Sequence, residues 1–165
     1  MSAQLVATSS SPQPVSGWRL GRLSGRFGRR DTWLTLTDQD KATVRSAAYG
    51  AVSLLAAASD RPHKAATAGT IALTSATGRV GHVLNAKSKD IHLTGKTVAE
   101  LADKVLPALA AAVALLDQHD RAEADNFRTT VLIALEAAAA TSRNGQPGPV
   151  VNEMTRKVAA ALHAA

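Results

Sequence analysis

Alanine dominates this sequence, and it limits the possible folds more than any other feature. Alanine is the best helix former because it loses no side-chain entropy in a helix. The chain has only two Trp, two Phe and one Tyr, so large side chains contribute little to a core. We therefore expect an all-α fold, an antiparallel bundle of about five Ala-rich helices with a flexible basic N-terminal arm.

The length of 165 residues suits a single domain. We expect a disordered tail and basic arm over residues 1–36 and a helical bundle over 37–165. The chain has no cysteine, which excludes disulfides and thiolate metal sites. Its longest largely apolar run, Val105–Leu116, is too short to cross a bilayer. No secretory signal is visible, so a cytoplasmic location is expected.

Helix starts are indicated by capping residues. Thr37 with Asp40 resembles a capping box, and it predicts a helix that runs to about Ala58. A second helix should begin at Asp60 with Pro62 and continue to Val83.

Three further helices follow a mostly polar loop at 85–95. Thr97 with Glu100 forms a second capping box, and Pro107 should bend that helix or split it in two. Asp120 begins the next helix. The segment 142–149, SRNGQPGP, predicts a turn before a last helix at Val150–Leu162.

The basic residues concentrate in the segment 17–30, GWRLGRLSGRFGRR. It holds five arginines and no acid, so it supplies +5 of the net charge of +6. On a helical wheel the arginines, the apolar side chains and the glycines form three separate faces. Four glycines cost such a helix roughly 3–4 kcal/mol relative to alanine, so it needs a partner or the bundle to form. The predicted contacts with an anionic partner are Arg19, Arg22, Arg26, Arg29, Arg30, Trp18 and Trp33.

Several roles for this arm stay open. It could be a solvated arm, it could pack on the bundle through its tryptophans, or it could bind a partner. Arginines on phosphates would make nucleic-acid binding salt-dependent, and the neighbouring aromatic residues would stack on bases. We expect a protein partner or a homo-oligomer. Nucleic acid is the chief alternative, and an anionic membrane surface ranks lower.

Two short motifs give only weak functional signals. Gly95-Lys96-Thr97 resembles the end of a phosphate loop, but Asp90 stands where that loop needs a glycine. Thr97 is already explained as a helix cap. The segment 77–85, TGRVGHVLN, ends like some recognition helices, although Gly81 would lie inside the helix. A fraying helix end is the simpler interpretation.

No metal site or catalytic residue is predicted. Of the five histidines, only His119 has an acid at the i, i+4 spacing of a helical metal site, namely Glu123. Asp117, Asp120 and Asp125 lie at the same helix junction, but helix N-termini attract acids in any case. No catalytic motif appears, and we expect no cofactor.

Two segments carry a family resemblance, AVSLLAAASD at 51–60 and the longer stretch 126–162. In both, an apolar helix ends in a polar turn and a new helix begins. This pattern resembles the small helical TerB-like proteins associated with tellurite resistance and Ala-rich actinobacterial relatives. The resemblance implies a helical fold and, in the family, an acidic metal-binding turn of Ala-Asp-Gly followed by a glutamate. Here Ser59-Asp60-Arg61 and Arg143-Asn144-Gly145 replace that turn, keeping Asp60, Gly145 and Glu153 but little of the charge.

These observations predict a non-enzymatic interaction or scaffold protein, in which a helical bundle presents the Arg-rich arm to a partner. The first alternative is a nucleic-acid-binding protein that uses the arm. The second is a metal- or small-molecule-sensing bundle of the TerB-like kind. A nucleic-acid binder should lose affinity and salt dependence together when the arm is removed, and a sensor should melt at a higher temperature with its ligand.

Overall fold

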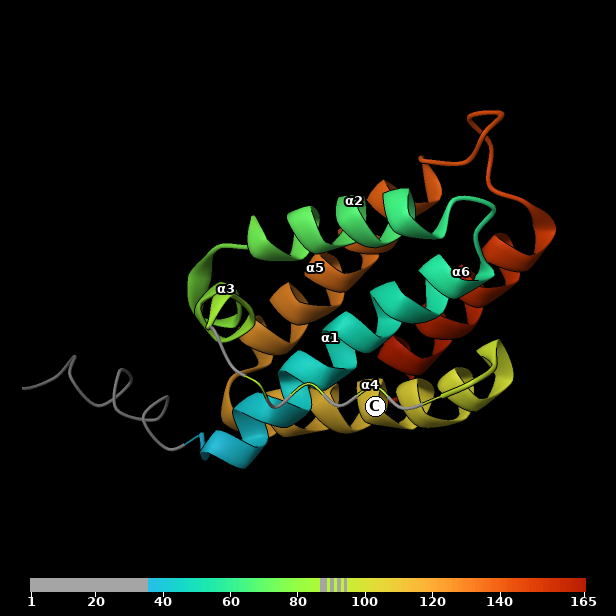
Figure 1. Ribbon diagram of the computed structural model, residues 1–165. Coiled ribbons are helices and arrows are strands. Elements are labelled where there is room, and N and C mark those ends of the chain that lie inside the picture. The colour runs from blue at the N-terminus through green and yellow to red at the C-terminus, as the bar shows by residue number, and fades with distance from the viewer. Residues whose placement is uncertain (1–35, 87–88, 90, 92, 94) are drawn as a thin grey trace, which may run out of the picture.

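The computed structural model describes residues 36–86, 89, 91, 93 and 95–165. The described residues are 78% helical and contain no strand, which confirms the all-α prediction (Figure 1). Among them no helix is both long and apolar enough to cross a membrane. The six helices of the described part are α1 (Asp38–Ala58), α2 (Pro62–Thr74), α3 (Gly78–Asn85), α4 (Val98–His119), α5 (Arg121–Ala139) and α6 (Pro149–His163).

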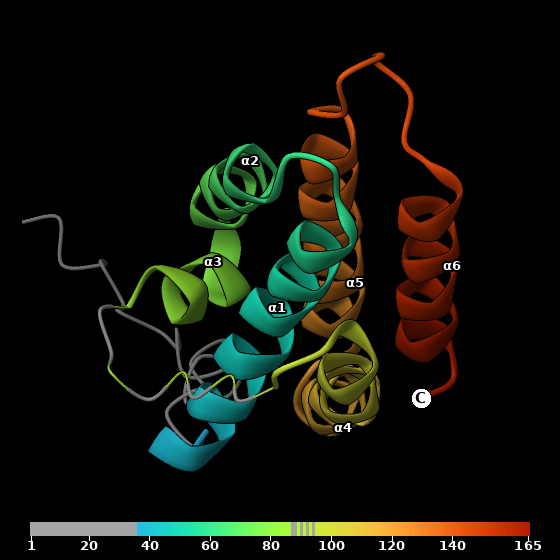
Figure 2. The ribbon, with the colours of Figure 1, turned by 45° about the vertical axis from the view of Figure 1, so that its right-hand side comes forward.

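Helix α1 is the centre of the bundle and contacts every other helix (Figures 1 and 2). Ala47, Ala48 and Ala51 on this helix are fully buried. Their small side chains let the neighbouring helices approach closely. Gly50 extends this surface, because a Cβ there would lie only 2.9 Å from Val105 of α4. The alanine-rich composition therefore gives a core built on close contacts between helices.

The first capping box is confirmed at the start of α1. The Thr37 hydroxyl accepts a hydrogen bond from the Asp40 backbone N–H at 3.2 Å, and the Asp40 carboxylate accepts one from the Thr37 N–H at 2.9 Å. The Thr37 backbone N–H, followed by its hydroxyl, holds the pKa of Asp40 below its usual range. This shift thus has a structural cause, a helix cap.

The starts of α4 and α5 also follow their predicted caps. The Thr97 hydroxyl accepts from the Glu100 N–H at 3.2 Å, while the Glu100 carboxylate accepts from the Lys96 N–H at 2.8 Å. The Asp120 carboxylate accepts from the Ala122 N–H at 3.0 Å. Each bond satisfies a backbone donor that has no partner within the helix.

The single helix predicted up to Val83 is in fact two helices, α2 and α3. At the end of α2, the hydroxyls of Thr74 and Ser75 both bond to the Ile71 carbonyl. Gly78 then begins α3 with a φ of +77°, a conformation that suits glycine. The prediction was wrong because these local bonds and this glycine turn the chain before the apolar pattern ends.

Helix α4 runs through Pro107 without a break, so of the two expected effects of Pro107, a bend or a split, the split is wrong. Proline has no N–H, which removes the helical partner of the Asp103 carbonyl. Both residues are exposed, so water is available to that carbonyl. The opposite face of α4 is buried and keeps the helix on the bundle, through Val105, Leu109, Val113 and Leu116.

Helices α2 and α5 lie side by side and run antiparallel (Figures 1 and 2). At one end of the pair, Asp60 before α2 contacts Arg143 after α5. At the other end, Val80 of α3 contacts Glu123 in the first turn of α5. This arrangement brings the α1–α2 turn and the α5–α6 turn together at one end of the bundle.

Candidate functional site

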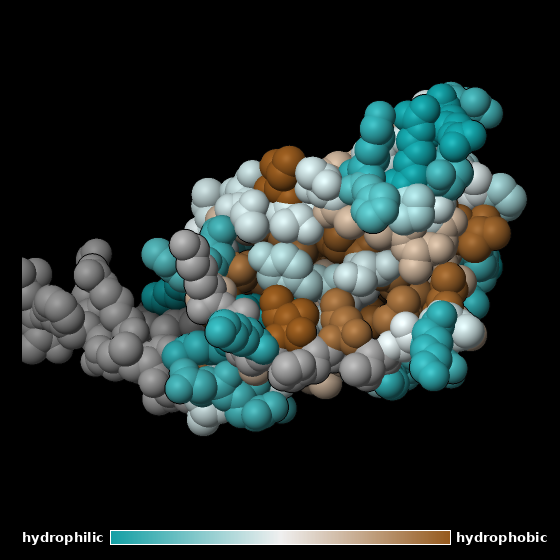
Figure 3. All heavy atoms as spheres, in the orientation of Figure 1, coloured by the Kyte–Doolittle hydropathy of each residue, from teal (hydrophilic) through white to brown (hydrophobic). Residues whose placement is uncertain are grey.

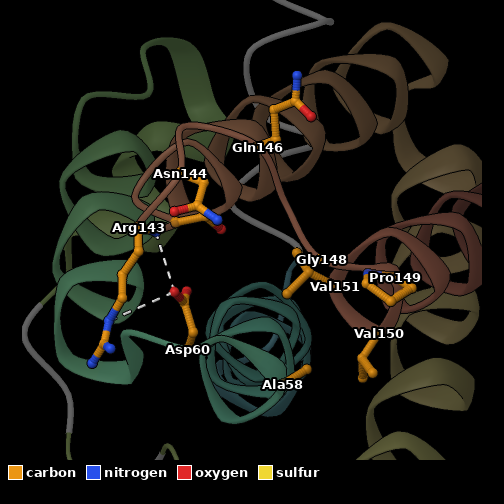
Figure 4. A pocket seen from close by; sticks show the side chains of 10 residues that line it. Ala58, Asp60, Arg143, Asn144, Gln146, Gly148, Pro149, Val150 and Val151 are labelled. Carbon is orange, nitrogen blue, oxygen red and sulfur yellow. Dashed lines mark hydrogen bonds and ion pairs between the residues drawn. The ribbon is translucent and has the colours of Figure 1, made fainter.

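A cavity of about 250 Å³ lies between the α1–α2 turn and the α5–α6 turn (Figure 4). Both turns are rich in polar residues, and they are the two turns on which the TerB-like resemblance rests. Figure 4 shows that the side chains of the cavity come from the end of α1, both turns and the start of α6. They are Ala58, Asp60, Ser142, Arg143, Asn144, Gln146, Gly148, Pro149, Val150 and Val151.

Asp60 joins the two turns. Its Oδ2 atom accepts a hydrogen bond from the backbone N–H of Arg143 at 3.1 Å and lies 4.0 Å from the Nε atom of the same residue. The side chain of Asp60 is 45% exposed and that of Arg143 is 70% exposed. An ion pair this exposed contributes about 0–1 kcal/mol, so its main effect is to hold one turn against the other.

The acidic residues kept from the TerB-like pattern do not come together. Asp60 faces Arg143, whereas Glu153 lies on α6 and pairs with Arg156 and Lys157. Among the residues that the structure describes, no three His, Asp or Glu side chains are grouped to hold a metal ion. Asp60 and Glu153 therefore pair with basic residues instead of forming the acidic turn that the resemblance implies.

A second hollow, of about 520 Å³, lies next to the cavity and is lined by Arg61, Pro62, His63, Lys64 and Arg143. We call the three cations Arg61, Lys64 and Arg143, together with the neighbouring His63, the cationic site. None of the residues that line this hollow is acidic. Within the described part of the chain, the side chains of Arg61 and Lys64 form no ion pair or hydrogen bond. Their charges are therefore available to an incoming anion.

The basic residues at the start of α2 are electrostatically unfavourable for that helix, because they lie at its positive N-terminal end. Arg61 is the N-cap residue and forms no side-chain cap, Lys64 lies in the first turn, and that turn has no acid. A helix N-terminus carries about half a positive charge, so each cation there costs about 0.3–1 kcal/mol. Positions where a sequence breaks a local stability rule are often functional ones.

A third hollow, of about 320 Å³, extends the cationic site along the outer face of α2. It is lined by His63, Lys64, Thr67, Ala68 and Ile71, and Ile71 is 59% exposed. The three hollows share residues and form one continuous surface, because Arg143 lines the first two and His63 and Lys64 line the last two. In Figure 3 hydrophilic residues gather at the upper right, over the two turns.

The N-terminus of α3 is already occupied by an acid. The Glu123 carboxylate accepts a hydrogen bond from the Val80 N–H at 3.2 Å, and Asn126 donates to the Thr77 carbonyl at 3.3 Å. A carboxylate at this helix end would repel a DNA phosphate. The geometry thus disfavours the segment 77–85 as a recognition helix. The hydrogen bond to Val80 also gives Glu123 a structural role that does not require a metal ion shared with His119.

The site residues predicted from the sequence lie outside the described residues. These are Arg19, Arg22, Arg26, Arg29, Arg30, Trp18 and Trp33. The cationic site was missed. The run from Arg61 to Lys64 at a predicted helix start was its one visible signal, and the contribution of Arg143 depends on the fold. Comparison with family models, curated proteins and solved structures gives no significant match, so the site is interpreted from its own geometry.

Proposed function

We propose that this protein is a non-enzymatic interaction protein, a helical bundle that binds an anionic partner protein. Its two basic contact regions would be the N-terminal arm and the cationic site. The observation that carries this proposal is the convergence of Arg61 and Lys64, at the start of α2, with Arg143 of the α5–α6 turn around one open hollow. Charges of one sign that gather on a surface favour partners of the opposite charge.

The exposure of the cationic site favours binding over catalysis. Lys64 and Arg143 are exposed to water, and Arg61 is half-buried. Catalytic electrostatics depends on fixed dipoles in a site from which water is excluded. Exposed cations instead attract a partner and set the orientation in which it docks.

The cationic site follows one end of α1, and the described part of the chain begins at the other end. The described chain begins at Leu36, which is buried, with 3% of its surface exposed. Helix α1 follows with 21 residues, which corresponds to about 30 Å. Its far end leads into the cationic site. The two basic regions are separate in the sequence, so each can be changed without altering the other.

A second candidate function is nucleic-acid binding through the arm. It is favoured by the five arginines of the segment 17–30 and by the two tryptophans, Trp18 and Trp33, beside them. Arginine on phosphate and aromatic rings on bases are the usual contacts of proteins that bind single strands. This candidate needs no contribution from the cationic site.

One binding experiment separates these two candidates. The full chain and a variant with all five arm arginines changed to glutamine would be titrated into labelled poly-glutamate and labelled single-stranded DNA. We expect the full chain to bind poly-glutamate at least as tightly as DNA. DNA binding that is tighter, strongly salt-dependent and lost in the arm variant would establish the second candidate. Failure to bind poly-glutamate would contradict the proposed function.

A further inference from the structure

We propose that the cationic site binds a short, extended acidic segment of a partner protein, in which an aliphatic residue lies about three positions from the acidic residues. This inference rests on the proposed function and names the ligand of one of its two basic regions. The acidic side chains would contact Arg61, Lys64 and Arg143, and the aliphatic side chain would contact Ile71.

The acidic character of the ligand follows from the charges. Three cations and His63 surround the central hollow, and no acid lines it. Asp60 compensates Arg143 only partly, because its carboxylate lies 4.0 Å from the guanidinium Nε and is half exposed. A carboxylate in the hollow would also interact favourably with the positive end of α2. Binding of an acidic ligand would thus offset the repulsion between these cations and the positive end of α2.

The extended shape of the ligand follows from the line of the hollows. Ile71 lies seven positions after Lys64 along α2, which corresponds to about 10 Å. An extended chain covers that distance in about three residues. Thr67 and Ala68 lie between them with small side chains, and they line the hollow of about 320 Å³. A chain lying along α2 would therefore place an aliphatic residue over Ile71.

The opposite end of the surface suits a peptide backbone. The cavity of about 250 Å³ that borders Arg143 is also lined by Asn144 and Gln146. Side-chain amides both donate and accept hydrogen bonds, as the N–H and C=O groups of an extended chain require. The arm of this chain is not the ligand, because residues 1–30 contain no acid.

The test uses the full chain and a fluorescein-labelled peptide, Gly-Asp-Glu-Asp-Ser-Leu-Gly, together with its reversed sequence. Either chain direction places the leucine three residues from the glutamate. Fluorescence anisotropy would measure the Kd. We expect the substitutions R61Q and K64Q together to weaken binding at least about tenfold. The matched control, R156Q with K157Q on α6, removes the same charge from another face and should change the Kd less than about twofold.

A second pair of variants tests the aliphatic contact. I71S should weaken binding of the leucine peptide about fivefold and leave binding of a peptide with serine in place of leucine unchanged. The control I133S removes an isoleucine side chain of similar exposure, 52% compared with 59% for Ile71, and should not change the Kd of the leucine peptide. Thermal unfolding of each variant would verify that it is folded. R61Q and K64Q remove cations from a helix N-terminus, so they should not lower the Tm.

Several results would overturn the proposal. Equal weakening by both double-charge variants would mean that only net charge matters. Equal binding of a peptide with Asn and Gln in place of the acids would exclude acidic recognition. Self-association that R61Q with K64Q abolishes, seen by sedimentation, would assign the site to a second copy of the chain. Tighter binding of labelled single-stranded DNA, lost in the same variant, would assign it to nucleic acid.

The arm variant separates this inference from the proposed function. Suppose poly-glutamate binding is lost in the arm variant while R61Q with K64Q has no effect on the peptide. The interaction function would then stand, and the assignment to the cationic site would fail. If the unmodified chain binds neither poly-glutamate nor the peptide, both proposals fail together.

Discussion

At the scale of single residues, Tyr49 shows how one side chain fixes a neighbouring helix. It is the only tyrosine of the chain. Its hydroxyl donates a hydrogen bond to the Leu84 carbonyl at 3.0 Å and so holds the end of α3 against α1. Burial raises the pKa of Tyr49 above its ordinary value of 10.0, and the nearby Arg45 guanidinium opposes that rise. The neutral phenol is therefore the form that the fold favours.

This shift predicts a loss of stability in alkali. Above pH 10 the phenol ionises first in the unfolded chain, so the contribution of Tyr49 to stability is complete below that pH and is lost as the pH rises through the folded-state pKa. Because there is one tyrosine, phenolate absorbance reports this group alone. The titration midpoint should lie higher in buffer than in concentrated urea. Equal midpoints in the two solvents would contradict the prediction.

Gly81 provides a second prediction at this scale. A Cβ on Gly81 would lie 2.2 Å from the Ala76 carbonyl oxygen, a backbone atom that cannot rotate away. We expect Gly81→Ala to destabilise the protein by about 1–3 kcal/mol in urea unfolding. Gly148→Ser is a suitable control, because a Cβ there would meet nothing within 4 Å and serine is a preferred N-cap. If both variants unfold like the parent protein, α3 is not packed as described.

At the scale of helices, α2 begins with charges that disfavour it. Lys64→Glu replaces a cation in its first turn with an acid, which the helix dipole favours. The variant should be more stable than the parent by about 0.5–2 kcal/mol while losing affinity for the acidic peptide. Lys157→Glu, in the middle of α6, changes the same charge and should bring no comparable gain. A lower Tm for Lys64→Glu would contradict the claim that a cation at this position destabilises α2.

The helices also show which parts of the fold the sequence reveals. Caps such as Thr37 with Asp40 depend on residues three apart, so they were predicted correctly. The break between α2 and α3 was missed, because hydroxyl bonds to the Ile71 carbonyl and the positive φ of Gly78 outweigh an apolar pattern that continues to Val83. Pro107 does not split α4, because the buried face of the helix keeps it on the bundle.

The candidate site was only half visible in the sequence for a related reason. Arg61, His63 and Lys64 are neighbours in the chain, so their shared charge can be read directly. Arg143 joins them only because α2 and α5 run antiparallel and Asp60 binds its backbone N–H across 83 residues. Local pattern contains no information about a contact of that range. The predicted arm residues Arg19 to Arg30 lie outside the described chain.

At the scale of the whole molecule, the small residues of α1 set how closely the bundle packs. Ala51 is fully buried, whereas Ala57 on the same helix is exposed. Ala51→Leu should destabilise the protein by about 1–3 kcal/mol, because the added atoms must push a neighbouring helix away. Ala57→Leu adds the same atoms in contact with water and should be close to neutral in urea unfolding. Similar losses in both variants would mean that helix propensity, not packing, controls the effect.

The pairing of helices across the chain has a consequence for how the molecule could be divided. Helix α1 packs against α4, and α2 packs against α5, so the first three helices and the last three interlock. A cut between Ala86 and Lys96 would leave two fragments, and each would lose the partner helices that cover much of its apolar surface. Neither fragment should hold its helices in isolation, since short helices depend on tertiary contacts. Mixed together, the fragments should reconstitute the bundle, with each half serving as the template on which the other folds.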